Sequence, residues 1–426
     1  MAVSILFFVF LALLLLGVPV AFALASASFL TVLYLGLPAH VFVIETVAGT
    51  DSSTLIAIPL FIFAGQLMMS GGISAKLISL ATAFVGHIRG GLGQVNVLSC
   101  LFFGGVSGSA LADVSAVGGA MIPQMVKRGY DRDYAVNVTV ASALVALLVP
   151  PSHNLILYSA SAGGSISIAD LFAAGIIPAL MLMIAIMFTA YIIARKRGYE
   201  TAKFPGFSEL AVRFIAALPG LLLIFVIFGG IRAGIFTAVE SASVAVLYAL
   251  AVTALLYRDL PWSEFFAACM RAARMSGVIL FVISSAAAFG WLMAYLEVPT
   301  KAVEAISALT DSPIGILILI NIALLILGTF MDMAPLIIIC TPIFLPIAKA
   351  FGIDPVHFGI ILVLNAGIGL ITPPVGSVLF VGTAIGKISI AQTLKTLWPF
   401  YLAGLAVLIL VAYVPIISMW LPNLLK

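Results

Sequence analysis

The segment Pro150-Pro151-Ser152-His153-Asn154 interrupts one apolar run, and Thr372-Pro373-Pro374-Val375-Gly376-Ser377 interrupts another, 223 residues further along the chain. Other punctuating residues recur at the same separation without a gap. The pairs are Gly105 and Gly328, Pro123 and Pro346, Gly129 and Gly352, and Asp131 and Asp354. Further on, Ile166-Ser167-Ile168-Ala169 matches Ile388-Ser389-Ile390-Ala391 after a slip of one residue. Because Gly and Pro punctuate local structure, this constant spacing indicates two copies of one structural unit.

The composition indicates that lipid is the solvent for this fold. Of the 426 residues, 64% are hydrophobic and only 8% are charged, and the mean hydropathy is +1.29. A spanning helix needs about 20 mostly apolar residues, and runs of that kind recur along the chain. The opening stretch, 1–16, lacks a basic region and a small-residue cleavage site, so we expect a retained span rather than a signal peptide. The composition therefore excludes a soluble catalytic domain.

Several other classes of protein are disfavoured. The net charge of +3 gives no indication of nucleic-acid binding. Cys100, Cys269 and Cys340 stand alone in apolar segments, which is typical of buried packing residues and not of disulfides or a metal site. The chain has no Gly-x-x-x-x-Gly-Lys-Ser/Thr loop, which argues against an ATP-driven pump.

The interruptions predict an all-α polytopic membrane protein built as an inverted repeat. Each copy contains five spans and one re-entrant hairpin, which gives about ten spans and two hairpins in total. The first copy covers 1–198, with scaffold spans in 1–70, a hairpin at 92–126, a broken span at 134–163 and a span at 168–194. The second covers 199–426, with scaffold spans in 211–296, a hairpin at 313–350, a broken span at 356–386 and a span at 391–422.

Lysine and arginine placement predicts the orientation of these copies. The run Arg195-Lys196-Arg197 lies between them, so we expect this connection to be cytoplasmic. Fifteen basic residues then fall on the cytoplasmic side, and only Arg232, Lys301, Lys349 and Lys426 fall outside. An odd number of spans inverts the second copy. The first hairpin then opens from the cytoplasm and the second from outside, and both termini are periplasmic in a bacterial inner membrane.

The hairpin tips and broken spans are the candidate functional segments, since irregular backbone at membrane depth is tolerated only where it is buried or lines a cavity. The first tip presents Ser107 and Ser109, and Asp113 follows one turn later. The second tip places Asp332 where the repeat has Ser109. Prolines at the breaks leave carbonyl oxygens free, which suits hard cations. The alternatives are that Asp113 is a helix cap and that each proline only kinks its helix.

Two further ionisable residues have competing interpretations. His153 is a candidate proton relay, but a lone histidine in a helical membrane protein is more often a packing or hydrogen-bonding residue. Glu240 follows Arg232 by about two turns of a predicted span. It is either an ion-coupling acid or, more often for intramembrane charges, a paired structural acid in the scaffold.

The chain resembles the large membrane subunit of tripartite ATP-independent periplasmic (TRAP) transporters over essentially its whole length. The resemblance rests on the order and spacing of short motifs. They are Ile58-Pro59-Leu60-Phe61, Gly65-Gln66-Leu67-Met68, Gly90-Gly91-Leu92, Ser107-Gly108-Ser109-Ala110, Ala112-Asp113, Ile122-Pro123, Arg128-Gly129-Tyr130, Pro150-Pro151-Ser152 and Thr372-Pro373-Pro374-Val375-Gly376.

The resemblance implies sodium-coupled uptake of a small organic acid, such as a C4-dicarboxylate, a keto acid or a sialic acid. It implies an elevator mechanism of the ion-transporter superfamily, and no enzyme activity. The implied coupling ion is Na+. The implied partners are an extracytoplasmic (periplasmic) substrate-binding protein and a small four-helix membrane subunit, which must be a separate polypeptide because this chain does not contain it.

The resemblance also implies site residues, carried over by position. One sodium site would use Ser107, Ser109, Pro151, Ser152 and Asn154. The other would use Gly328, Asp332, Thr372 and Gly376. The solute would lie between the two tips, near Ser107, Asp113, Asn154, Thr372 and Pro373.

Two alternatives belong to other classes of protein. Gly105-Val106-Ser107-Gly108 matches the Gly-x-Ser-Gly pattern of intramembrane serine proteases, in which His153 would be the base. The duplication argues against a protease, because Phe330 replaces Ser107 in the second copy. A passive channel is the other alternative, and it would not need paired cation sites.

Overall fold

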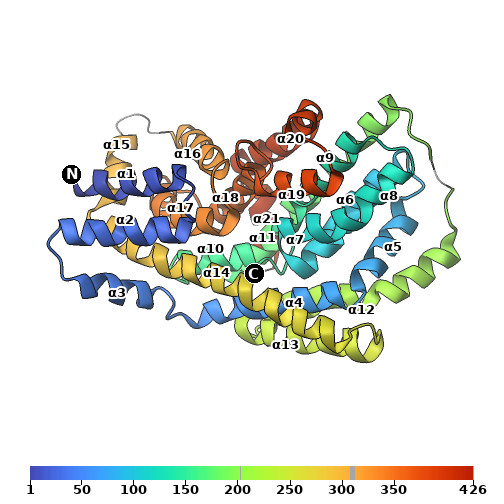
Figure 1. Ribbon diagram of the computed structural model, residues 1–426, viewed down its shortest axis with the longest axis horizontal. Helices are drawn as coiled ribbons and strands as arrows, with labels where there is room; N and C mark the ends of the chain where they lie inside the picture. Colours follow the sequence, from blue (N-terminus) through green and yellow to red (C-terminus); the bar gives the residue numbers. More distant parts are fainter. Residues whose placement is uncertain (202, 308–311, 426) are drawn as a thin grey trace.

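The computed structural model describes residues 1–201, 203–307 and 312–425, and within them all regular structure is helical (Figure 1). The elements of the first copy are α1 (Ala2–Leu15), α2 (Val20–Tyr34), α3 (Ala39–Ala48), η1 (Ser53–Ile56), α4 (Ala57–Ser70), α5 (Ile73–Val85), α6 (Gly91–Ser107), α7 (Ala110–Asp113), the π-helical η2 (Val114–Gly118), α8 (Gly119–Lys127), α9 (Arg132–Ser142), η3 (Val145–Leu147), α10 (His153–Ser161) and α11 (Ile168–Lys196).

The second copy follows the same order. Its elements are α12 (Phe207–Arg232), α13 (Ala238–Leu250), the π-helical η4 (Ala251–Leu256), α14 (Trp262–Tyr295), α15 (Val298–Ser307), α16 (Pro313–Gly328), α17 (Met333–Ala350), α18 (Pro355–Gly369), α19 (Ser377–Gly386), α20 (Ile390–Tyr413) and α21 (Ile416–Leu424). Adding 223 to the residue numbers aligns α5 with α15, α6 with α16, α9 with α18 and α10 with α19.

The two copies differ most in their scaffold helices. The first copy breaks between α3 and α4, whereas α14 runs through the equivalent region as one helix of 34 residues. At 1.5 Å per residue this helix is about 50 Å long, well over the roughly 30 Å of a hydrocarbon core. It crosses the lower face of the molecule and packs on α2, α3, α4 and α17 (Figure 1).

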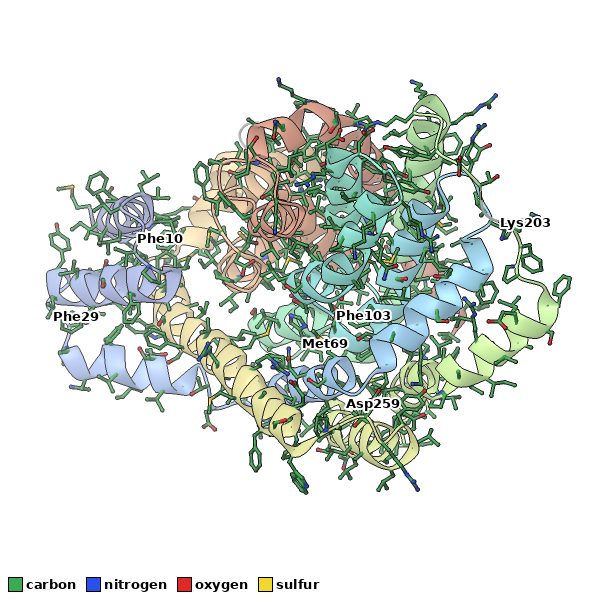
Figure 2. All side chains as sticks on the ribbon, turned by 45° about the vertical axis from the view of Figure 1, so that its right-hand side comes forward. Phe10, Phe29, Met69, Phe103, Lys203 and Asp259 are labelled. Carbon is green, nitrogen blue, oxygen red and sulfur yellow. The ribbon has the colours of Figure 1, made fainter. Side chains whose placement is uncertain are left out.

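Within the described residues, six helices are long and apolar enough to cross a membrane, or seven if the pair of η1–α4 and α5, bent by 71°, counts as one span. The other expected spans coincide with apolar helices of 10–17 residues, including α1, α2, α18 and α19. Polar residues gather at the connections between helices. Figure 2 shows Lys203 and Asp259 at such turns, while Phe103, which is only 1% exposed, lies inside the molecule.

The broken spans exchange partners between the copies. α10 of the first copy packs on α17 of the second hairpin, and α19 of the second copy packs on α9 and η2 of the first. Small residues permit such contacts, since a Cβ on Gly382 of α19 would lie 2.3 Å from Val140 Cγ1 of α9, and one on Gly359 of α18 would lie 2.3 Å from Tyr158 Cε1 of α10. The hairpins and broken spans therefore form one interlocked body.

Candidate functional site

The first hairpin turns at Gly108. This residue has φ +59°, the left-handed conformation that glycine adopts most readily at the end of a helix, and it ends α6. Ser109 has extended backbone and caps α7, its hydroxyl accepting from the Ala112 N–H at 3.4 Å. The sequence Ser-Gly-Ser therefore ends one helix and starts the next within three residues, which is the tip predicted from the sequence.

Asp113 lies inside this tip. Its side chain is fully buried, and the Ser107 hydroxyl donates a hydrogen bond to its Oδ1 atom. Its second oxygen, Oδ2, is buried with no hydrogen-bond partner among the described residues. Burying an unpaired carboxylate oxygen is costly, so this atom is a natural acceptor for a proton or a ligand for a cation.

The first break lies against this tip. The Asn154 side-chain amide donates to the Gly108 carbonyl at 3.0 Å, and its Oδ1 atom is left buried and unpartnered. A Cβ on Gly108 would lie 3.0 Å from the Pro151 carbonyl and 3.2 Å from His153 Nδ1. His153 is buried and hydrogen-bonds to the Ser107 backbone, which fits the packing interpretation of this histidine. Ser152 is also buried, and its hydroxyl donates to the Leu147 carbonyl at 2.6 Å.

The second hairpin and second break meet in the same way. Asp332 immediately precedes α17, and its Oδ1 accepts a hydrogen bond from the Ser377 hydroxyl at 3.1 Å. The Val375 N–H donates to the Thr329 carbonyl at 3.1 Å. Gly328 and Gly369 touch through their backbones, since a Cβ on Gly369 would lie 2.6 Å from Gly328 Cα.

Three predicted residues lie within this second break. The Thr372 hydroxyl donates to the Ile368 carbonyl at 2.7 Å. Gly376 adopts φ +41° immediately before α19. The Pro373–Pro374 peptide bond is cis, as is the Pro150–Pro151 bond of the first break.

In both copies, a side chain in the first turn of the helix after the break bonds to the hairpin tip. Asn154 and Ser377 are separated by 223 residues, and they bond to Gly108 and Asp332 respectively. Sequence analysis selected Asn154 and missed Ser377. The signal was present, because the repeat spacing that relates the two breaks leads from Asn154 to Ser377.

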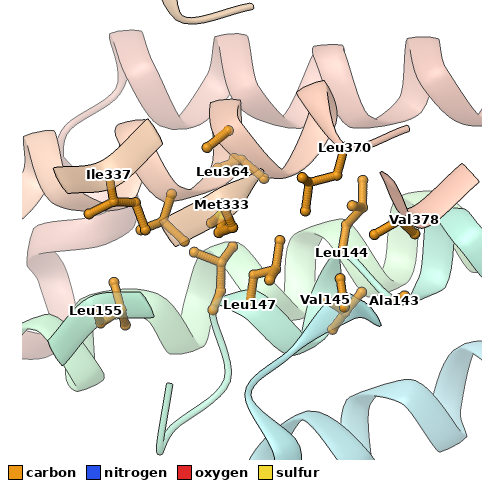
Figure 3. Close-up of a cluster of buried hydrophobic side chains, with 14 of the residues drawn as sticks. Ala143, Leu144, Val145, Leu147, Leu155, Met333, Ile337, Leu364, Leu370 and Val378 are labelled. Carbon is orange, nitrogen blue, oxygen red and sulfur yellow. The ribbon is translucent and has the colours of Figure 1, made fainter. Parts of the chain in front are cut away.

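An apolar cluster joins the two breaks. Leu147 and Leu370 are equivalent in the repeat, and each immediately precedes its break. Figure 3 shows Leu144 and Leu147 facing Leu364 and Leu370, with Val378 of α19 beside Leu144. α19 also packs on α7, so both tips and both breaks belong to one region of the interlocked body.

Glu240 does not lie in the middle of a span, contrary to the sequence-based expectation. It is exposed in the first turn of α13 and forms a capping box with Thr237. Arg232 pairs instead with Asp170, at 2.9 Å. The prediction was wrong because α12 ends at Arg232, so a turn separates the two residues.

Two sets of helices, each with a hairpin and a broken span, define a multi-pass helical membrane protein of the transporter class. Residues 7–417 match the family model described as the DctM component of the tripartite ATP-independent periplasmic transporter. The chain therefore belongs to this family of TRAP transporter large permease subunits, as its resemblance predicted.

Individual relatives agree with this assignment. The chain is 42% identical to Salmonella typhimurium YgiK, covering 99% of this chain and 97% of that protein. It is 37% identical to the C4-dicarboxylate TRAP transporter large permease protein DctM of Rhodobacter capsulatus, over all of both chains. It is 36% identical to the sialic acid TRAP transporter large permease protein SiaM of Vibrio cholerae, covering 98% and 97%. The last two are named as transport proteins and not enzymes, which sets the protease alternative aside.

A solved structure shares the fold. The crystal structure of the Alcanivorax borkumensis YdaH transporter superposes with a TM-score of 0.60 at 14% identity, covering 87% of this chain and 86% of that one. At this identity the likeness concerns the fold alone. It supports an all-α polytopic transporter architecture.

Proposed function

We propose that this chain carries out sodium-coupled uptake of a small organic acid across the bacterial inner membrane. The observation that carries the proposal is that each hairpin tip is bonded to the break of its own copy, with buried oxygen atoms left unpartnered at the first pair. C4-dicarboxylates and sialic acids, named for two relatives, share a carboxylate. We assign this chain the same chemical class of solute.

The first proposed sodium site uses Ser107, Ser109, Asn154 and the Pro151–Ser152 backbone. Asn154 Oδ1 is available because its amide nitrogen is the atom that bonds to Gly108. The Ser152 hydroxyl proton is committed to Leu147, but a hydroxyl oxygen keeps lone pairs for a cation. Freed backbone oxygens beside hydroxyl and amide groups are the ligands that a hard cation prefers.

The second proposed sodium site uses Gly328, Asp332, Thr372 and Gly376, and we add Ser377 to it. Asp332 belongs to the second site, and Asp113 lies beside the first, where the Ser107 hydroxyl donates to it. These acids are not equivalent in the repeat, since Asp113 aligns with Leu336 and Asp332 with Ser109. One sodium ion at each site neutralises one carboxylate.

The solute is proposed to lie between the tips, near Ser107, Asp113, Asn154, Thr372 and Pro373. An anion beside Asp113 is repelled until that charge is neutralised, which makes solute binding depend on sodium. Inward movement of an anion also works against a negative-inside potential, at roughly 2.3 kcal/mol per charge per 100 mV. More than one sodium ion per carboxylate overcomes this cost.

The proposed movement is that of an elevator. The interlocked body of hairpins and broken spans moves against a scaffold made of α1–α4 and α12–α14. Solute is delivered by a periplasmic binding protein, and a separate small membrane subunit completes the complex. Both termini are periplasmic in this arrangement. The exchange of partners between the copies supports a body that moves as a unit, because no hairpin can shift without its neighbour's broken span.

The test is uptake of radiolabelled organic acid into proteoliposomes that contain this chain with its binding protein and small subunit. We expect uptake to require a sodium gradient and to be lost in Asp113→Asn and Asp332→Asn. Ser377→Ala should raise the sodium concentration needed for half-maximal uptake. Ser115→Ala is the matched control, since its hydroxyl only bonds to the Leu111 carbonyl.

Three outcomes would contradict the proposal. Uptake that persists without sodium would favour a channel. Wild-type sodium dependence in both aspartate variants would contradict the assignment of the two sodium sites. A library of carboxylates can be chosen by thermal-shift screening of the binding protein. If none of them is transported, the assignment of an organic acid as the solute is wrong.

A further inference from the structure

A basic surface lies at one end of the interlocked body. Its cations come from four segments of the chain, and all are exposed. They are Lys127, Arg128, Arg132, Arg195, Lys196, Lys387 and Lys395.

Hydrogen bonds hold these segments together. Arg132 Nη1 donates to the Lys387 carbonyl at 3.5 Å, which joins the start of α9 to the turn between α19 and α20. Asn137 of α9 donates to Thr396 Oγ1 of α20 at 2.8 Å. Arg197, just beyond α11, pairs with Asp131 at 2.9 Å and Asp133 at 2.7 Å. These bonds bring the ends of α9, α11 and α20 together, and α8 packs on α9 beside them.

The acids closest to this surface are already paired. Asp131 and Asp133 both bond to Arg197, and Tyr199 donates a further hydrogen bond to Asp131 at 2.8 Å. Arg197 offsets one of these two negative charges, so the seven exposed cations still far outnumber the acids beside them. Glu200 follows in the next loop, three residues before Lys203.

Aromatic side chains place the basic surface at the depth of the lipid headgroups. Trp398 follows Lys395 by three residues, is 62% exposed and packs edge-on against Tyr401. Tyr191 precedes Arg195 by one turn and is 37% exposed. Exposed tryptophan and tyrosine concentrate at the membrane–water interface, so the cations one turn beyond them lie among the headgroups.

The opposite ends of the same helices have no such surface. The first turn of α11 carries Asp170, and the last turn of α20 carries no basic residue. Lys349 is the one basic residue near that end of the second hairpin. The basic residues of α11 and α20 are therefore confined to one end of these helices.

We infer that this basic surface binds the headgroups of anionic phospholipids in preference to zwitterionic ones. Arginine presents paired donors that match phosphate oxygens, and lysine supplies point charge at the same depth. A headgroup seated here contacts α8, α9, α11 and α20 together. The binding stands apart from the proposed transport, because it needs only insertion in a bilayer.

The test uses Trp398 as a local probe. Trp262, Trp291 and Trp420 are replaced by Phe, and the protein is reconstituted with lipid brominated either on phosphatidylglycerol or on phosphatidylcholine. Bromine quenches only nearby tryptophan, so the ratio of the two quenching curves measures which lipid occupies the surface. We expect phosphatidylglycerol to be enriched by at least about threefold, and the enrichment to fall with added salt.

Two charge-removal variants test the enrichment, and the first should abolish it. One combines Lys127→Gln, Arg128→Gln, Lys387→Asn and Lys395→Gln, with Asn chosen because residue 387 has φ +51°. The other combines Arg195→Gln and Lys196→Gln and should lower the enrichment in part. Arg274→Gln, an exposed cation on α14, is the control and should leave it unchanged.

Equal quenching of Trp398 by both lipids, with the basic surface unsubstituted, would overturn the inference. Enrichment of phosphatidylglycerol that survives in the fourfold variant would overturn it too. Both readouts are independent of sodium and solute. If the protein binds anionic lipid but does not transport, the lipid-binding inference stands and the proposed function is contradicted.

Discussion

Tyr134 and His357 occupy equivalent positions in the two copies, and each bonds to an equivalent backbone carbonyl. The Tyr134 hydroxyl donates to the Ala190 carbonyl at 3.2 Å, and His357 Nε2 lies 3.3 Å from the Ala412 carbonyl. His357 makes a second contact, 2.7 Å from Nδ1 to the Ser418 hydroxyl of α21. The broken span thus contacts a backbone carbonyl of the last long helix in both copies, through a tyrosine in the first copy and a histidine in the second.

Removing these ties should destabilise the protein to different extents. Tyr134→Phe deletes one hydrogen bond, and we expect a loss of about 0.5–1.5 kcal/mol. His357→Ala also leaves a cavity and a buried carbonyl without a partner, so its loss should be larger, about 2–4 kcal/mol. Thermal unfolding in detergent measures both. Equal midpoints for His357→Ala and the parent protein would show that the tie does not contribute.

Glycine should be irreplaceable where each tip meets its break, for steric reasons. In Gly108→Ala a Cβ meets the Pro151 carbonyl at 3.0 Å with φ at +59°, and in Gly369→Ala it meets Gly328 Cα at 2.6 Å. We expect both variants to separate tip from break and to abolish uptake. Gly290→Ala is the control, since open space surrounds it within α14 and alanine favours helix by about 1 kcal/mol. Uptake is measured in proteoliposomes, and normal uptake by Gly108→Ala would contradict the close approach.

Asp170 and Arg232 form the one ion pair that joins the two copies within residues 1–201, 203–307 and 312–425. Asp170 lies in the first turn of α11 and Arg232 in the last turn of α12, where helix dipoles favour each charge. Their side chains are 22% and 21% exposed, so the coupling should be modest, about 0.5–1 kcal/mol.

A double-mutant cycle with Asp170→Asn and Arg232→Gln measures this coupling from thermal unfolding. We expect the double variant to lose less than the sum of the single losses. High salt should shrink the coupling. Strict additivity of the two substitutions would show that the pair does not hold α11 to α12.

The Asp133–Arg197 pair should contribute a pH-dependent stabilisation. Asp133 lies in the first turn of α9, at its polar end, and hydrogen bonds from Arg197 lower its pKa to about 2 despite partial burial, with Thr396 adding a smaller effect. A carboxyl whose pKa is lowered by folding stabilises the folded state fully above its ordinary pKa of about 3.9. The contribution disappears as the pH falls through about 2.

Asp133→Asn provides the comparison for this pH dependence. The parent protein should unfold at a higher temperature than the variant at pH 6, and the difference should shrink steadily below about pH 4. Arg197→Gln should remove the same difference at all pH values. A gap between parent and Asp133→Asn that is constant from pH 6 to about 2.5 would contradict the assignment.

The linear order of residues was enough to predict the duplication, the helical membrane class, and the tip and break positions. These features depend on local physics. Glycine and proline interrupt helices wherever they occur, and apolar runs of sufficient length enter lipid in any context. The separation of 223 residues then located Ser107, Ser109, Asn154 and Asp332 in segments that the structure brings together.

Contacts between distant segments depended on packing in three dimensions. That α10 packs on the second hairpin and α19 on the first could not be deduced from either copy alone, since each copy contains an equally apolar partner of its own. Glu240 was misplaced for a local reason: Gly234 adopts φ +68° just after α12, and Thr237 and Glu240 form a capping box at the start of α13. Local preferences act over a few residues, whereas the packing of α10 on α17 and of α19 on α9 was decided by burial between helices of different copies.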